Sequence, residues 1–447
     1  MIRSFSFRWI KYSALLGPIL IAGCATYRPV PLPTAPDLTK TPSLTVPASQ
    51  FLLPGLKPHP FPKHGLDETA VITLAVFDNP DLKAARLQAG VADAQLLQAG
   101  LLPDPVLSVG FATSALNYGY DAALSENIEA LIMRGAARAG ARAHRQQVNL
   151  DILWQEWQVA EKARELFIQA RANDRLQRVL TANRDLLASR YSQDNRAMQK
   201  GDLTLSTVSA DLAVLVNADT SLRQLQLNAN LTRHQLNQLL GLNPSVQLRL
   251  IGPDIAQPLS REEFETAVAA LPHRRADLLA LRAGYQSQEQ SVRQAILAQF
   301  PALSAGVDKA RDPAEGVNTF GPSVSLTLPL FNRNRGQIAI QRATCAVLRQ
   351  TYQARLDQAA SDADQVWQAT RIMQGQLRDL DARLPILEKT AAAAEQSFRQ
   401  RNLDAGLYLS VESSLLAKQA EAIRLRASLD NAQSALRTLL GLPLGAP

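Results

Sequence analysis

A short segment in which apolar residues alternate with small or polar ones occurs twice in this chain of 447 residues. The first copy, "DPVLSVGF", begins at residue 104, and the second copy, "FPALSAGV", begins at residue 300. An offset of 196 positions aligns these two copies. Further along the chain, "LLGL" at residues 239–242 recurs at 439–442, an offset of 200 positions. Landmarks that return in the same order indicate an internal duplication. We therefore divide the body of the chain into a first repeat, residues 66–258, and a second repeat, residues 259–443.

Each repeat is predicted to be mostly helical. The chain is 46% hydrophobic but only 5% aromatic, and Ala and Leu, which supply most of the apolar share, favour helices packed along narrow seams. We expect each repeat to contain one helix, two strands, a very long helical region and a final helix. The first helices are expected over 67–101 and 261–299, and the long regions over 134–198 and 336–399. Pro385 and Gly375 are expected to bend or break the second long region.

The alternating segments are predicted to be strands with one apolar face and one small, polar face. In the first copy Leu107, Val109 and Phe111 alternate with Ser108 and Gly110. Partner strands are expected within 124–132, where Glu126 interrupts the apolar face, and within 323–331. Strands of about ten residues with this pattern are typical of a membrane β-barrel. The residues expected to face its lumen are Ser108, Gly110, Ser304, Gly306, Ser325 and Thr327.

Four strands cannot close a barrel, and an open sheet edge in lipid leaves backbone groups unpaired. Several chains must therefore share one barrel if these strands span a bilayer. Two chains would supply eight strands and three would supply twelve, and the alternation alone does not choose between them. The alternative is a small soluble sheet that caps a helical body.

The N-terminal segment has the features of a lipoprotein signal peptide. Arg3, Arg8 and Lys11 precede the apolar run "ALLGPILIAGC", which is too short to span a bilayer as a helix. "LIAGC" resembles a bacterial lipobox, which implies removal of residues 1–23 and lipidation of Cys24. Residues 24–65 are then rich in proline and are expected to form an extended lipidated tether. Ala25 after the cysteine favours the outer membrane.

The chain as a whole resembles the TolC-type outer-membrane efflux factors, in their lipoprotein branch. The resemblance rests on the element order, the duplication, the stretch "NPDLKAARLQAGVADAQLLQAGLLPDPVLSVGF" and the stretch "LPLFNRNRGQIAIQRA". It implies a homotrimer with a twelve-stranded barrel in the outer membrane and a long periplasmic α-helical tunnel. It also implies a periplasmic adaptor (a membrane fusion protein) and an inner-membrane pump, usually of the resistance-nodulation-division type. "PLFNRNRG" is similar to the heavy-metal efflux branch, which implies metal cations as cargo.

The same resemblance places a pore constriction at the turns within 198–205 and 399–407. Asp202 and Asp404 lie in these turns and are the acidic candidates for the constriction. Arg401 departs from the family pattern, which commonly has Gly near this position, and its charge puts cation selectivity in doubt. Either aspartate could equally cap the helix that follows it.

Other functional classes lack support in the sequence. The net charge of +7 is modest and no basic run is interleaved with aromatic residues, which argues against nucleic-acid binding. The five histidines are scattered, and phosphate-binding and nucleophile motifs are missing, so we expect no enzyme activity, no cofactor and no metal site. Cys345 is expected to be a small buried apolar residue. The rival hypotheses are a lipid-anchored periplasmic coiled-coil scaffold or adaptor, and the same channel serving drug or other organic-compound efflux or protein secretion.

Overall fold

The computed structural model of the chain describes residues 27–41, 65–113, 118–252 and 258–443. The chain divides into a small unit, Met1–Leu38, and a large unit, Thr39–Pro447. In the small unit, residues 27–38 are exposed and form neither helix nor strand, as expected for a proline-rich segment. The predicted signal peptide, residues 1–23, and Cys24 lie outside the described residues.

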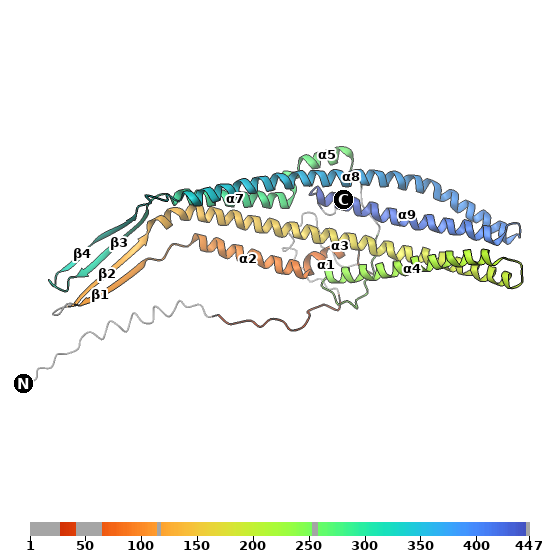
Figure 1. Cartoon of the computed structure of the whole chain (residues 1–447), viewed down its shortest axis with the longest axis horizontal. Coiled ribbons are helices and arrows are strands. Elements are labelled where there is room, and N and C mark those ends of the chain that lie inside the picture. The colour runs from red at the N-terminus through yellow and green to blue at the C-terminus, as the bar shows by residue number, and fades with distance from the viewer. Residues whose placement is uncertain (1–26, 42–64, 114–117, 253–257, 444–447) are drawn as a thin grey trace, which may run out of the picture. The chain divides into compact units, whose positions relative to one another are not determined.

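The large unit contains two copies of one element order, with one additional short helix, α6, in the second copy (Figure 1). The first copy consists of α1 (Glu68–Asp78), α2 (Pro80–Gly100), β1 (Val106–Thr113), β2 (Tyr118–Asn127), α3 (Ile128–Gln199) and α4 (Leu205–Leu239). The second consists of α5 (Arg261–Ala269), α6 (Leu271–Arg274), α7 (Ala276–Leu297), β3 (Ala302–Arg311), β4 (Asn318–Thr327), α8 (Arg335–Arg399) and α9 (Ala405–Leu439). The predicted fold class, a duplicated and mainly helical chain with two strands per repeat, is confirmed.

The first helix of each repeat is interrupted, which corrects the prediction of single helices over 67–101 and 261–299. Asn79 is non-helical (φ −55°, ψ 123°), and its side chain accepts a hydrogen bond from the backbone N–H of Leu82 (2.9 Å) to start α2. Pro80 occupies the first turn of α2, where its missing N–H costs nothing. At the equivalent position of the second repeat, Arg275 is also extended and separates α6 from α7.

The long helices are more continuous than predicted, whereas the first helices are less so. α8 runs unbroken from Arg335 to Arg399, with Pro385 and Gly375 inside it, so of the expected bend or break, the break does not occur. α3 begins at Ile128, ahead of the predicted 134, and its 72 residues span about 110 Å at 1.5 Å per residue. Packing of α8 on α7 and α9 maintains the helix despite the hydrogen bond that Pro385 cannot donate.

The four strands form one antiparallel sheet in the order β1-β2-β3-β4. The partner strands lie earlier in the sequence than predicted, at 118–127 in place of 124–132 and at 318–327 in place of 323–331. β2 ends where the Asn127 side chain accepts a hydrogen bond from the backbone N–H of Ala130 (3.0 Å) and caps α3. β4 ends just before Leu328 and Pro329, and a proline cannot donate to a strand ladder.

The two larger apolar cores among the described residues lie along the helices, one in each repeat. In the first, Leu74 of α1 packs with Trp157 and Phe167 of α3 and with Leu240 after α4. In the second, residues of α5, α7, α8 and α9 pack together, and the rings of Phe264 and Trp367 stack with centroids 4.7 Å apart. These cores hold the four-helix part of the unit together between the sheet and the hairpin turns (Figure 1).

Segments near residues 39 and 66 are bound to the first repeat. The backbone N–H of Thr39 donates to the carbonyl of Gly241 (3.2 Å), and the N–H of Asn243 donates to the carbonyl of Thr39 (2.8 Å). Leu66 forms a similar parallel bridge with Leu250. The predicted tether, residues 24–65, is therefore attached to the first repeat at Thr39, and the residue that directly follows the tether is attached to it as well.

Candidate functional site

The register of the sheet sorts its residues into two faces, because directly opposed residues of neighbouring strands point to the same side. Leu107 opposes Leu124, Leu124 opposes Val307, and Val307 opposes Pro322. We call this side the apolar face. Its members are Leu107, Val109, Phe111, Thr113, Tyr118, Tyr120, Ala122, Leu124, Glu126, Leu303, Ala305, Val307, Lys309, Arg311, Asn318, Phe320, Pro322, Val324 and Leu326.

The opposite side, which we call the small polar face, holds every residue that was predicted to face a lumen. Its strand positions are mainly Ser, Gly, Ala, Thr and Asp, with Val106 and Asn127 at strand ends. The six predicted residues on this face are Ser108, Gly110, Ser304, Gly306, Ser325 and Thr327. The structure therefore places them on a common face, while their exposure to a lumen stays a prediction.

Glycine on the small polar face permits close approach between strands. A Cβ atom added at Gly306 would lie 2.5 Å from the backbone carbonyl oxygen of Leu124 on the neighbouring strand. At Gly110 the space that a side chain would take is filled by the carboxylate of Asp121. The small residues that give this face its polar character are thus also required by the packing of β1, β2 and β3.

The apolar face is exposed in the single chain. Phe111 is 83% exposed, Phe320 76% and Leu107 67%. A contiguous exposed apolar surface of this kind marks contact with a partner or with a membrane. β1 and β4 also lie at the two edges of the sheet, and within the described residues each pairs with a strand on one side. The exposed apolar face lacks a covering layer, and the outer edges of β1 and β4 lack a neighbouring strand, among the described residues of a single chain.

The turns at the far ends of the two hairpins, α3–α4 and α8–α9, share one backbone motif. Gly201 and Arg401 both adopt the left-handed conformation, with φ of 86° and 61°. In each turn the N–H of this residue donates three positions back and the next N–H donates five positions back, which is a Schellman ending. The same ending at Gly241 and Gly441 explains why "LLGL" occurs twice. Arg401 is the non-glycine member of these four.

The two candidate aspartates of the constriction have different roles in their turns. Asp404 caps α9, because its carboxylate accepts a hydrogen bond from the backbone N–H of Leu407 (3.3 Å). Asp202 is exposed and does not cap α4, since Thr204 takes that role. The capping alternative therefore holds for Asp404 and is wrong for Asp202.

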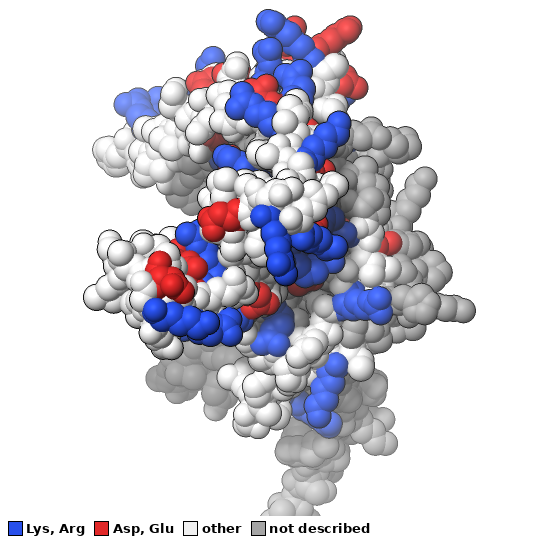
Figure 2. Space-filling model, turned by 90° about the vertical axis from the view of Figure 1, so that its right-hand side faces the viewer, with Lys and Arg blue, Asp and Glu red and all other residues white. Residues whose placement is uncertain are grey.

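Cations accompany both aspartates in the sequence of the turns. Lys200 lies two residues before Asp202, and Arg401 lies three residues before Asp404. Figure 2, which views the molecule from the end where the turns lie, shows Lys and Arg mixed with Asp and Glu over this surface. The turns thus carry both signs of charge.

Sequence reasoning missed a cluster of charges next to the first turn. The guanidinium of Arg190 on α3 lies 2.9 Å from the carboxylate of Asp211 on α4 and 3.6 Å from that of Asp194. Burial, followed by the neighbouring Asp194 carboxyl, raises the pKa of Asp211 to about 6, although Arg190 opposes this shift. The cluster links α3 to α4 and lies close to Gly406 near the start of α9.

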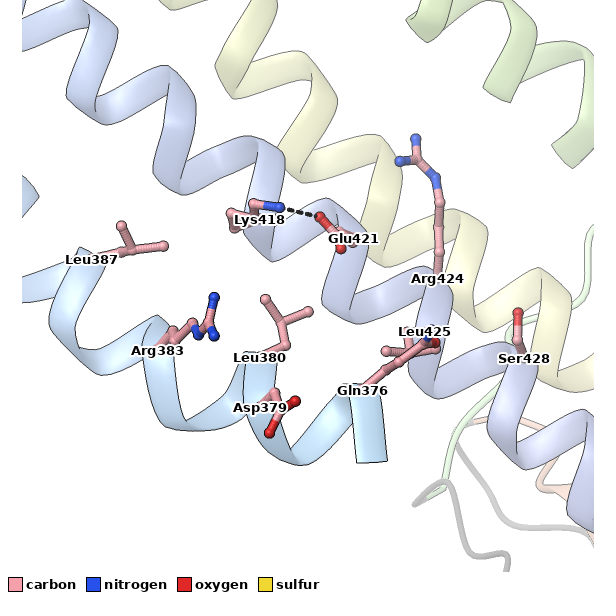
Figure 3. Close-up of a pocket in the computed structure, with 10 residues that line it drawn as sticks. All are labelled: Gln376, Asp379, Leu380, Arg383, Leu387, Lys418, Glu421, Arg424, Leu425 and Ser428. Atoms are coloured by element: carbon pink, nitrogen blue, oxygen red, sulfur yellow. Dashed lines mark hydrogen bonds and ion pairs between the residues drawn. The ribbon is translucent and has the colours of Figure 1, made fainter. Parts of the chain in front are cut away.

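A groove of about 580 Å³ lies between α8 and α9 (Figure 3). Asp379 and Arg383 of α8 line it with Lys418 and Glu421 of α9, and the last two form an ion pair (2.7 Å). Its walls carry both signs of charge around a few leucines, which suits contact with a polar protein surface better than enclosure of an apolar molecule.

Two further features of the described residues bear on other kinds of site. Within the described ranges, His, Cys, Asp and Glu side chains do not gather in threes that could hold a metal ion. The helices of the described part of the chain are too polar or too short to span a bilayer. Cys345 on α8 is half-buried, and burial is the main cause that raises the pKa of its thiol.

Comparison with known proteins connects this fold to one class. Residues 269–442 match the family model described as outer membrane efflux protein. Among solved structures, the chain is similar to CusC, with a TM-score of 0.68 and 15% identity over 92% of this chain and 99% of CusC. It is also similar to a membrane protein from Pseudomonas aeruginosa (TM-score 0.72, 14% identity, 94% and 98% coverage). The outer membrane protein VceC from Vibrio cholerae gives a TM-score of 0.67 and 19% identity, with 84% and 96% coverage.

A search of curated protein sequences finds no significant match. At identities below 20%, the solved structures establish the fold, and the match of the family model adds a sequence pattern over residues 269–442. The resemblance expected from the sequence is therefore confirmed at the level of the fold: the chain has the fold of the TolC-type outer-membrane channels, and residues 269–442, in its second repeat, match the family model described as outer membrane efflux protein.

Proposed function

We propose that the protein is the outer-membrane channel of a tripartite efflux system, working as a passive conduit. The observation that carries the proposal is the sheet with two open edges, one exposed apolar face and one small polar face. A strand of ten residues rises about 33 Å, and a tilt of about 40° brings this to about 25 Å, the height of the apolar band of a membrane barrel. The apolar face would contact lipid, and the small polar face would line water.

Three copies would then close a twelve-stranded barrel by pairing β4 of one protomer with β1 of the next. Closure is required because an open strand edge in lipid leaves backbone N–H and carbonyl groups without partners. In that barrel Ser108, Gly110, Ser304, Gly306, Ser325 and Thr327 face the lumen. α3, α4, α8 and α9 of each protomer would contribute to a twelve-helix tunnel that continues the barrel into the periplasm.

The inner end of the tunnel would be narrowed by the two hairpin turns. Asp202, Asp404 and Arg401 are the constriction residues that we propose. Because Lys200 and Arg401 accompany the two carboxylates, three copies of these turns would form a ring of mixed charge. Such a ring gives a weaker preference for cations than carboxylates alone.

Anchoring and assembly follow from the same proposal. Cys24 would carry the lipid that fixes the N-terminus in the outer membrane. A periplasmic adaptor would contact the helical hairpins, and the groove between α8 and α9 offers it a polar surface. An inner-membrane pump, of the resistance-nodulation-division type, would supply the energy and choose the cargo. Heavy-metal cations are the cargo that the "PLFNRNRG" motif favours, and drugs or other organic compounds are the alternative.

The test is to purify the mature protein from outer membranes and to measure its oligomeric state and its conductance in planar bilayers. We expect a trimer and discrete conductance steps. A monomer that leaves the bilayer conductance unchanged would refute the channel and favour the lipid-anchored scaffold. Cargo is tested separately in a deletion strain. Unchanged tolerance to zinc, cobalt, cadmium, copper and silver would contradict the assignment of heavy metals.

A further inference from the structure

Aromatic and cationic residues on the apolar face gather at one end of the sheet. Phe111, Tyr120 and Arg311 share one row across the strands, and Lys309 and Phe320 share the next row. Both rows lie near the turns that connect the strands, away from the helices. The rows nearer the helices are aliphatic apart from Glu126, and they contain Leu107, Leu124, Val307, Pro322, Ala305, Val324, Leu303 and Leu326.

Charge at this end of the sheet is separated by face. Lys309 and Arg311 belong to the apolar face, whereas Asp121 and Asp308 belong to the small polar face. The carboxylate of Asp308 accepts a hydrogen bond from the hydroxyl of Ser323 (2.9 Å) on its own face. The four residues lie close together in the sheet, on β2 and β3. Strand alternation nevertheless directs the two carboxylates to one face and the two cations to the other.

The remaining acidic groups near the cations lie in the turn after β3. The carboxylate of Asp312 accepts hydrogen bonds from the backbone N–H groups of Ala314 (2.6 Å) and Glu315 (3.1 Å), so it is engaged within the turn. The Glu315 side chain is exposed. Among the described residues, ion pairs do not join Lys309 or Arg311 to any carboxylate. Both cations are exposed and available to a partner outside the chain.

The physical chemistry of a membrane surface explains this arrangement. Tyr and Phe side chains favour the boundary between hydrocarbon and headgroups, and barrels carry aromatic girdles at that level. A cation that faces lipid is costly at the middle of the bilayer but costs little near the interface, where a long side chain can extend to the headgroups. Lys309 and Arg311 lie about 20 Å and about 26 Å along β3 from Leu303 and its aliphatic row, at about 3.3 Å per residue.

We propose that Lys309 and Arg311, framed by Tyr118, Tyr120 and Phe320, bind the phosphate groups of outer-leaflet lipid. This inference rests on the proposed function, because it requires the sheet to cross the outer membrane with its turns outside. The partner is a phosphorylated lipid, since its acyl chains suit the aliphatic rows and its anionic headgroup suits the two unpaired cations. In a trimer the contact occurs three times around the barrel and fixes its depth in the outer leaflet.

The experiment uses the full mature protein in neutral detergent, with native mass spectrometry to count bound lipid. The probes are a diphosphorylated glucosamine lipid, lipid A, and the same lipid without its phosphates. The test variant is Lys309→Gln/Arg311→Gln. Its matched control is Arg371→Gln/Lys389→Gln, which removes the same charge from exposed positions of α8, far from the sheet.

We expect wild type and control to prefer the phosphorylated lipid, and the test variant to bind it about 30-fold more weakly, since each cation at an anionic surface contributes about fivefold. Equal binding of both lipids by the wild type, or undiminished binding by the test variant, would overturn the inference. Conductance is measured on the same samples. A conducting wild type whose lipid binding ignores phosphate refutes this inference alone, whereas a wild type that forms no channel refutes the proposed function as well.

Discussion

The charge cluster beside the first hairpin turn predicts that the contact between α3 and α4 weakens as pH rises. Asp211 is 7% exposed and lies 2.9 Å from Arg190, and burial raises its pKa to about 6 from a model-peptide value of 3.8. Between these two values the folded chain holds a proton that the unfolded chain has released. Stability therefore falls as pH rises from about 4 to 6 and then stays constant at the lower level.

The magnitude follows from the size of the shift. The difference between 3.8 and about 6 corresponds to about 3 kcal/mol at 1.36 kcal/mol for each pH unit. Screening near the protein surface reduces this to about 1–2 kcal/mol. Asp211→Asn keeps the shape and a hydrogen-bond acceptor for Arg190 but cannot ionise. We expect this variant to gain that stability at pH 7.5 and to lose the pH dependence.

Hydrogen exchange of the backbone amides in residues 205–215, corrected for intrinsic rates, measures this local stability. In the wild type, protection should be about 2- to 10-fold higher at pH 5 than at pH 7.5, because pH 5 lies between the unfolded-state and folded-state pKa values of Asp211. Asp211→Asn at pH 7.5 should be protected at least as well as the wild type at pH 5. Asp219→Asn, a change on the same helix at a more exposed carboxylate, is the control and should leave the pH dependence intact. Wild-type protection that is flat or rises with pH would refute the reasoning.

Three further predictions concern stability and assembly. Arg401→Gly should stabilise the protein by about 0.5–1 kcal/mol, read as a higher urea midpoint, because glycine removes the strain of a left-handed arginine. Arg86→Ala should cost about 3–5 kcal/mol in the same assay, because Arg86 pairs with the fully buried Glu156 (2.7 Å), and an unchanged midpoint would show that the pair is dispensable. Gly306→Ala should reduce the yield of heat-stable trimer on gels, because its Cβ would meet a backbone carbonyl of β2 at 2.5 Å. Gly321→Ala, with open space at that position, should not reduce it, and equal yields would contradict the packing argument.

The sequence predicts the order of elements because both repeats use the same local chemistry at the same points. Pro105 and Pro301 each precede a strand, and the serine and glycine that follow belong to one face of the sheet. "LLGL" recurs because Gly241 and Gly441 end equivalent helices in the left-handed conformation. These motifs depend only on residues that are adjacent in sequence, so they can be recognised without knowing how the helices and strands pack.

The ends of helices and strands were harder to predict, because a short run of alternating apolar residues can occur in either a strand or a helix. Ile128, Ala130 and Ile132 continue the alternation of β2, yet they form the first turns of α3. The decisive signal was Asn127, a good N-cap residue followed by Glu129 in the first turn. For the first helix, Pro80 after Asn79 was a sufficient signal for an interruption.

To predict the charge cluster near the first turn and the separation of charge on the sheet, one must know which residues of neighbouring helices or strands lie opposite one another. Arg190 and Asp211 lie at nearly equal distances from Gly201 along the chain, so folding the chain back at this turn would have brought them together. Lys309 and Asp308 are adjacent in sequence, and their opposite faces follow from strand alternation once β3 is known to extend to Arg311. Which residues of β2 and β4 lie opposite Lys309 and Asp308 can be known only from the register of the sheet.

The central claim is that one face of the sheet lines water and the other faces lipid in a closed barrel of several copies. Ser325 and Leu326 are adjacent on β4, so they lie at matched depth on opposite faces. Each is replaced by cysteine in a Cys345→Ala background, and the protein in liposomes is treated with a charged thiol reagent that does not cross membranes. The account predicts rapid modification at Ser325→Cys and protection at Leu326→Cys. Equal modification of both positions would contradict it.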